Sequence, residues 1–160
     1  MDGYRIERFT GEGEAAVIDF WRREGIELRE REGRRVHEVL FVAVHESGEL
    51  AAECSAYLQR DARLRLDLWF LRVYTGREHR MGFLATELIF AARRHLEARF
   101  TEGEDVRGAG VAMEIENAGL STRGHAVWPN TGAVFLGLTE RGHHLRVNYF
   151  EGALAPGPPP

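Results

Sequence analysis

The most constraining feature of this sequence is a long amphipathic stretch that follows directly on an alternating one. Within residues 81–100, apolar side chains recur at spacings of three or four, and charged side chains lie off that stripe. The apolar positions are Met81, Leu84, Ala85, Leu88, Ala92, Leu96 and Phe100. This spacing predicts a helix with one apolar face. Residues 63–75 alternate apolar with charged or aromatic side chains and predict a strand, which Gly76 ends. A strand that leads into a packed helix favours an α/β fold.

The remaining pattern adds mostly strands. In chain order we expect a strand at 4–9, a helix at 14–24, a hairpin of 38–45 with 49–59, a strand at 111–116, and a hairpin of 133–139 with 144–150. For residues 130–140 a helix is the alternative, and we prefer the hairpin because Val134, Leu136 and Leu138 alternate with small residues. Residues 26–37 are highly charged and fit either a short exposed helix or a loop. Residues 117–130 are irregular, with one helical turn after Ser121.

Length and composition set the class of protein. With 160 residues, 44% hydrophobic and 29% charged, the chain fits one domain over residues 1–154 with a disordered proline-rich tail at 155–160. The longest apolar run, Val39–Val44, is far shorter than the roughly 20 residues of a membrane helix. The N-terminus lacks an apolar signal region, and the single Cys54 excludes an internal disulfide. We therefore expect a cytoplasmic protein without membrane contact.

The junction between the predicted strand and the long helix is a candidate anion site. The first N–H groups of a helix have no partners within the helix, and the helix dipole adds about half a positive charge there. A diphosphate is the kind of ligand that such donors bind.

This junction resembles a motif of the GNAT superfamily of acyl-coenzyme A transferases. In the family, Arg/Gln-x-x-Gly-x-Gly/Ala opens the helix; here the segment reads Arg80-Met81-Gly82-Phe83-Leu84-Ala85. Arg80 and Ala85 match, Phe83 stands at the first glycine, and Gly82 is displaced by one position. The Phe83 side chain would either crowd a pyrophosphate or point into the core. The order of elements over residues 4–150 also resembles the family. The resemblance implies a mixed, mostly antiparallel sheet of six or seven strands, flanked by helices, with splayed central strands.

The resemblance also implies the activity, which is transfer of an acyl group, in the first place acetyl, from acyl-CoA to an amine. The amine would attack the thioester directly, without a metal. The acetyl-CoA would bind in a gap between the strands at 63–75 and 111–116. The residues implied in cofactor binding are Val73, Tyr74, Thr75, Arg80, Met81, Gly82, Phe83, Leu84, Ala85 and Thr86. The acceptor, a small molecule or a peptide, would enter beside residues 14–37 and the C-terminal hairpin.

The catalytic candidates come from two strands. Met113-Glu114-Ile115 resembles the Leu-Glu-Val stretch of ribosomal-protein N-terminal acetyltransferases, in which the glutamate is the base. Glu114 is thus the first candidate for the general base, Asp67 the second and Glu116 the third. The alternative for each is a solvated strand carboxylate.

The family's general acid has no counterpart at its usual position in this sequence. The family's tyrosine on the helix after the fifth strand is lacking, since Ala126 stands at its position. Tyr149 or a water molecule would then act as the general acid. The alternative for Tyr149 is ordinary packing in the sheet.

Five further residues each have two interpretations. His125 and Trp128 either shape a substrate pocket or, for Trp128, cap the core. His143 and His144 lie beside a predicted turn, where we expect solvated histidines rather than zinc ligands. Cys54 fits buried packing rather than a nucleophile.

Two alternatives to acyl-CoA transfer stay open. One is a transferase of the same fold that takes aminoacyl-tRNA; the net charge of −4 opposes it unless several arginines form a local basic face. That face would comprise Arg77, Arg80, Arg93, Arg94 and Arg99. The other is a ligand-binding module without catalysis, favoured by the missing tyrosine. A homodimer is also open.

Overall fold

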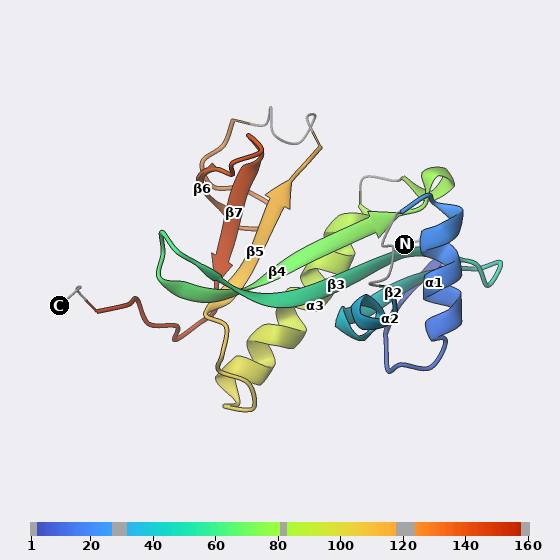
Figure 1. Ribbon diagram of the computed structural model, residues 1–160, viewed down its shortest axis with the longest axis horizontal. Helices are drawn as coiled ribbons and strands as arrows, with labels where there is room; N and C mark the ends of the chain where they lie inside the picture. The colour runs from blue at the N-terminus through green and yellow to red at the C-terminus, as the bar shows by residue number, and fades with distance from the viewer. Residues whose placement is uncertain (1–2, 27–31, 81–82, 118–123, 158–160) are drawn as a thin grey trace. The chain divides into compact units, whose positions relative to one another are not determined.

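The computed structural model describes residues 3–26, 32–80, 83–117 and 124–157 (Figure 1). Met81, Gly82 and the helical turn expected after Ser121 lie outside these residues. The chain divides into two compact units: Met1–Ala56 with Arg72–Ala92, and Tyr57–Leu71 with Arg93–Pro160. No helix in the described residues is long and apolar enough to cross a membrane.

Seven strands of the described chain form one hydrogen-bonded sheet in the order β1-β2-β3-β4-β5-β7-β6. Their bounds are β1 Tyr4–Arg8, β2 Val39–His45, β3 Leu50–Asp61, β4 Leu66–Thr75, β5 Gly110–Ile115, β6 Val134–Leu138 and β7 His144–Tyr149. The β4–β5 ladder is parallel, and the ladders β1–β2, β2–β3, β5–β7 and β6–β7 are antiparallel. The predicted mixed, mostly antiparallel sheet and both predicted hairpins are confirmed, so the alternative of a helix over 130–140 is wrong.

The helices are α1 Glu14–Arg23, α2 Glu32–Arg35 and α3 Leu84–Thr101, with 3₁₀ turns η2 Val36–Glu38 and η3 Arg77–His79. Of residues 26–37, for which helix and loop stayed open, residues 32–37 are helical, and residues 27–31 lie outside the described chain. The helix expected at 81–100 is described from Leu84 to Thr101, and Glu87 N–H donates to the Phe83 carbonyl at 2.9 Å. The predicted apolar stripe is buried, because Leu84, Leu88 and Ala92 are fully covered.

Strand β4 begins three residues later than expected because Asp61 forms a turn. Its Oδ1 accepts the backbone N–H groups of Arg63 and Leu64, both at 3.0 Å. Those two groups are thereby removed from sheet pairing. Arg65 then takes a left-handed conformation with φ 55°, and the strand starts at Leu66.

Each unit has its own core. In the first unit, Val17, Phe20 and Trp21 of α1 pack with Val36, Val39 and Val42. In the second, Leu68 and Phe70 of β4 pack with Ala112 of β5 and with Leu145 and Val147 of β7. The spacing i, i+3, i+4 on α1 and the alternation on the strands produce these faces.

The first core encloses one acidic side chain, Glu53 of β3. Its Oε1 accepts a 3.0 Å hydrogen bond from Trp21 Nε1, and the residue has no exposed surface. Burial raises the pKa of Glu53 to about 7, against the opposing effects of the Trp21 hydrogen bond and of the Arg35 and Arg72 charges. The folded chain therefore holds a proton on Glu53 at pH values where the unfolded chain has lost it.

We expect this proton to make stability depend on pH. Between the ordinary carboxyl pKa of 4.5 and about 7, the folded state binds more protons, so unfolding becomes easier as pH rises. At about 1.4 kcal/mol per pH unit, the full loss is roughly 3 kcal/mol. Glu53→Gln still accepts from Trp21 but cannot ionise.

Urea unfolding of the wild type and of Glu53→Gln at pH 5 and pH 8 measures the effect. From pH 5 to pH 8, the free energy of unfolding of the wild type should fall by roughly 2–3 kcal/mol relative to that of Glu53→Gln. Glu46→Gln, in the exposed turn after β2, should follow the wild type at both values. Parallel behaviour of all three proteins would contradict the assignment.

Candidate functional site

The β4–β5 ladder is unusually short and marks the centre of the candidate site. It pairs Trp69, Phe70 and Leu71 with Val111, Ala112 and Met113. No β4–β5 pairing is described after these three pairs, although β4 continues to Thr75 and β5 to Ile115. The last pair of this ladder joins Leu71 to Met113. Glu114 is the first residue of β5 beyond the ladder.

The turn that leaves β4 is held by contacts within the first unit. Gly76 N–H donates to the Ala51 carbonyl at 2.8 Å, and His79 N–H donates to the Gly76 carbonyl at 2.9 Å. Glu24, which follows α1, accepts the Arg77 N–H at 3.0 Å. A side chain at Gly76 would approach the Glu24 carboxylate and the Ala51 carbonyl within 3.3 Å, so the turn packs closely only with glycine.

The start of α3 is described from Phe83 onward. Leu84 is buried and anchors the first turn, whereas Ala85 and Thr86 are partly exposed. The Phe83 side chain is 37% exposed and makes an edge-on contact with the Tyr4 ring, with centroids 6.4 Å apart. Phe83 therefore packs against β1 instead of entering the core. Arg80 is exposed.

The end of β4 presents two different faces. Tyr74 packs on the α1 core, and its hydroxyl accepts a 3.1 Å hydrogen bond from Arg35 Nη2. By the alternation of a strand, Val73 and Thr75 point to the opposite face. The backbone of residues 73–75, predicted to bind the cofactor, follows the last residue of β4 that pairs with β5.

Glu114 belongs to a compact polar cluster in the second unit. Its Oε1 lies 2.9 Å from Thr139 Oγ1 and 2.8 Å from His143 Nδ1. The backbone N–H of His143 donates to the same Thr139 hydroxyl at 3.2 Å. The predicted base is thus partly exposed and hydrogen-bonded to a histidine. Glu116 lies just past β5 and pairs with Arg141 at 3.1 Å on the surface.

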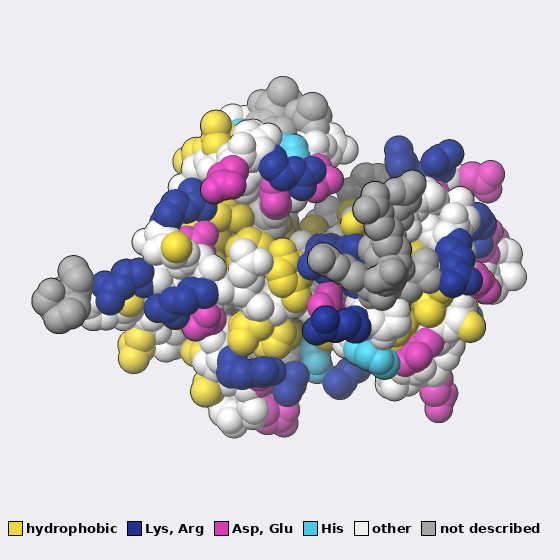
Figure 2. All heavy atoms as spheres, in the orientation of Figure 1, with side chains coloured by type: hydrophobic (Ala, Val, Ile, Leu, Met, Phe, Trp, Pro, Cys, Tyr) yellow, Lys and Arg dark blue, Asp and Glu magenta, His cyan; other side chains and the backbone are white. Residues whose placement is uncertain are grey.

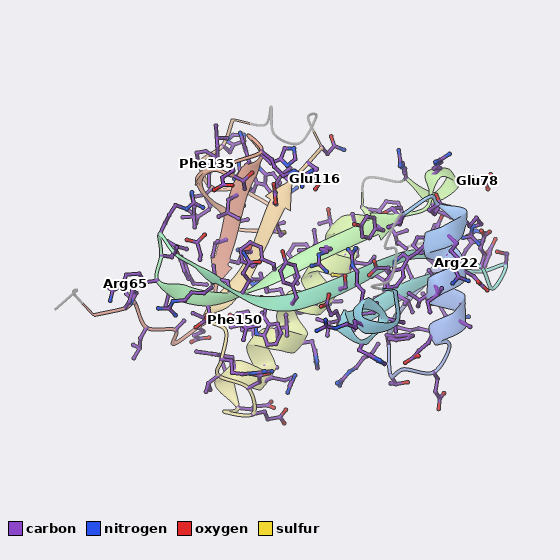
Figure 3. All side chains as sticks on the ribbon, viewed as in Figure 1. Arg22, Arg65, Glu78, Glu116, Phe135 and Phe150 are labelled. Atoms are coloured by element: carbon purple, nitrogen blue, oxygen red, sulfur yellow. The ribbon has the colours of Figure 1, made fainter. Side chains whose placement is uncertain are left out.

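Asp67 and Tyr149 lie at the other end of this part of the sheet. In the β5–β7 ladder, Glu114 is opposite Leu145, whereas Tyr149 is opposite Gly110. Four residues of strand at about 3.3 Å each separate the two positions by about 13 Å. Figure 3 shows the same separation, with Glu116 beyond one end of the ladder and Phe150 beyond the other. Asp67 precedes the β4–β5 ladder and pairs with Arg60 at 3.0 Å.

The three catalytic candidates are therefore not brought together. Burial and the Asp61 charge also raise the pKa of Tyr149, which does not favour proton exchange near neutral pH.

Trp128 and His125 are organised by a buried arginine. Arg146 of β7 is 1% exposed, and its guanidinium lies 4.2 Å from the Trp128 ring centroid. Arg146 Nη2 donates to the His125 carbonyl at 2.9 Å and Nη1 to the Ala133 carbonyl at 3.2 Å. Trp128 thus packs against Arg146, while the His125 side chain is exposed.

Two residues of the site were missed by sequence reasoning. His143 was expected to be solvated, but its side chain is only 24% exposed and bonds to Glu114. Arg146 reads as an ordinary polar residue of a hairpin strand. His143 lies two residues before Leu145, which is opposite Glu114 in the β5–β7 ladder. This offset is the only available signal that His143 lies on the same face of the sheet as Glu114.

The structure also bears on Cys54, on metal binding and on the distribution of surface charge. Cys54 is buried, and burial raises the pKa of its thiol well above the ordinary value, so it is packing and not a nucleophile. Among the described residues, no group of three or more histidine, cysteine or acidic side chains could hold a metal ion. On the face shown in Figure 2, arginines are interspersed with acidic side chains.

Comparison with known proteins identifies the architecture. No protein-family model and no curated protein sequence matches this chain. Solved structures do match. A GNAT-family acetyltransferase from Streptococcus pneumoniae superposes with a TM-score of 0.65 at 15% identity, over 92% of this chain and 99% of that chain. Ribosomal-protein-S5-alanine acetyltransferase from Vibrio fischeri gives 0.64 at 9% identity, over 96% and 97%. A GNAT N-acetyltransferase from Escherichia coli, in complex with CoA, gives 0.59 at 15%, over 92% and 81%.

We expect Arg146 to be essential for the segment around Trp128. Arg146→Ala removes the guanidinium from three backbone carbonyls and from the Trp128 ring. Loss of such a buried network should lower the free energy of unfolding by about 2–4 kcal/mol in denaturant titration. Arg141→Ala, whose side chain is 65% exposed, should change it by less than about 0.5 kcal/mol. Equal effects of the two substitutions would contradict this role.

Proposed function

Because the chain has the fold of the GNAT acetyltransferases, we propose that it is an N-acyltransferase that moves an acyl group, most simply acetyl, from coenzyme A to an amine. The observation that carries the proposal is the β4–β5 ladder, which stops after three pairs and is followed by the glycine turn into α3. In this proposal the β4 backbone beyond the ladder would bind an extended thioester arm, and the start of α3 would bind its phosphates.

The donor would be held by residues 73–86. The backbone of Val73 and Thr75 would bond to the pantetheine arm, and the N–H groups at the start of α3 would bind the diphosphate. The E. coli relative was solved with CoA, which supports this class of donor. The Phe83 ring, at the position of the family's first glycine, packs edge-on against Tyr4.

The chemistry needs a proton acceptor where the strands diverge. An alkylammonium group must lose a proton before its nitrogen attacks the thioester carbonyl, and the C–S bond then breaks to release a thiolate. Glu114, just beyond the ladder, belongs to the cluster of polar side chains that would receive this proton. Since Tyr149 lies about 13 Å along the sheet from Glu114, water is the better proton source for the thiolate.

We expect acetyl-CoA to stabilise the chain and a negative charge at the start of α3 to abolish this effect. At a hundredfold excess over Kd, a single-site ligand adds about 2.7 kcal/mol, which is several degrees in Tm for a chain of this size. Ala85→Asp should remove that shift, since an acidic residue in the first turn suits the helix itself but repels a diphosphate.

The matched control is Ala98→Asp, the same change at an exposed position near the other end of α3. It should keep the full acetyl-CoA shift in thermal denaturation. An unchanged Tm of the wild type with saturating acetyl-CoA, together with no thiol release in the presence of primary amines, would overturn the proposed function.

A further inference from the structure

His143 is held in one orientation by two groups. Its Nδ1 lies 2.8 Å from Glu114 Oε1, and its backbone N–H donates to Thr139 Oγ1. The hairpin closes through Thr139 N–H, which donates to the His143 carbonyl at 2.8 Å. Both the ring and the backbone of this residue are thereby fixed relative to the end of β5.

The directions of these hydrogen bonds determine the state of the ring. The Thr139 hydroxyl accepts from the His143 N–H, so its own proton is directed to Glu114 Oε1. A carboxylate oxygen accepts only, so Nδ1 of the neutral imidazole is the donor at 2.8 Å. The lone pair then resides on Nε2, which has no hydrogen bond to any described residue. An imidazole oriented by a carboxylate in this way is a competent proton acceptor.

The cluster is also accessible from solvent. The side chains of His143 and Glu114 are 24% and 30% exposed, so both can be reached from solvent. Glu114 is the first β5 residue past the ladder with β4, and His143 lies on the same face of the sheet because Leu145 is opposite Glu114. The Oε1 atom of Glu114 already accepts two hydrogen bonds, which makes Glu114 better suited to orient the imidazole than to receive the substrate's proton itself.

We propose that His143 is the catalytic base, and that Glu114 and Thr139 are positioning residues which hold its Nε2 toward the acceptor amine. This inference rests on the proposed function. The ammonium group gives one proton to Nε2, and the free amine attacks the thioester carbon. The C–S bond breaks, the nitrogen loses its second proton, and the thiolate takes one up. Nε2 then releases its proton to water, so each turnover yields one proton.

The first experiment measures thiol release from acetyl-CoA with spermidine, lysine and glycinamide as probe amines. His143→Ala should lower turnover by about 10²–10⁴ while retaining the acetyl-CoA shift in Tm, and added imidazole should restore part of the rate. Arg141→Gln, in the same hairpin turn and exposed, should keep the wild-type rate. His143→Ala turnover within threefold of the wild type would overturn the proposal and leave Glu114 as the base.

The second experiment does not depend on activity. In histidine labelled with ¹⁵N, long-range ¹H–¹⁵N correlations distinguish the protonated from the unprotonated ring nitrogen. We expect a protonated Nδ1 and an unprotonated Nε2 for His143 at pH 8 in the wild type, and loss of this preference in Glu114→Leu. The opposite tautomer in the wild type would overturn the proposal even in an active enzyme. A wild type with neither acetyl-CoA stabilisation nor thiol release overturns the proposed function, and the role of His143 with it.

Discussion

The candidate site depends on the early end of one parallel ladder. After Leu71 and Met113, the strands β4 and β5 are no longer described as paired, although each continues. Buried strands normally satisfy their backbone groups with a neighbour, so a strand without one on that side has donors and acceptors for another partner. The first side chain past this point on β5 is Glu114. Glu114 forms a polar cluster with Thr139 and His143.

Two of the buried ionisable groups, Glu53 in the first unit and Arg146 in the second, are stabilised differently. Glu53 has one hydrogen bond from Trp21, and burial raises its pKa to about 7, so it avoids a buried charge by keeping its proton near neutral pH. Arg146 cannot easily lose its proton. It instead donates to backbone carbonyls and lies over the Trp128 ring. The first arrangement makes stability depend on pH, and the second holds a loop.

Much of the fold was predictable because it rests on local patterns. The alternation at Val134, Leu136 and Leu138 predicted a strand, and the apolar stripe through Leu84 and Leu88 predicted a buried helix face; both are confirmed. The start of β4 was less accurate, since Asp61 determines where this strand begins. This end depends on hydrogen bonds that periodicity does not contain.

By itself, the sequence determined the order of strands and helices, the faces that are buried, and the turn from β4 into α3, because each follows from contacts between residues close in the chain. Only the tertiary structure decided which polar residues meet. Asp67, Glu114 and Tyr149 all looked suitable for proton transfer, yet the β5–β7 register separates Tyr149 from Glu114 and places His143 beside Glu114 instead. The physical reason is that strand register is determined by the packing of whole faces, to which no single polar side chain contributes a recognisable local signal.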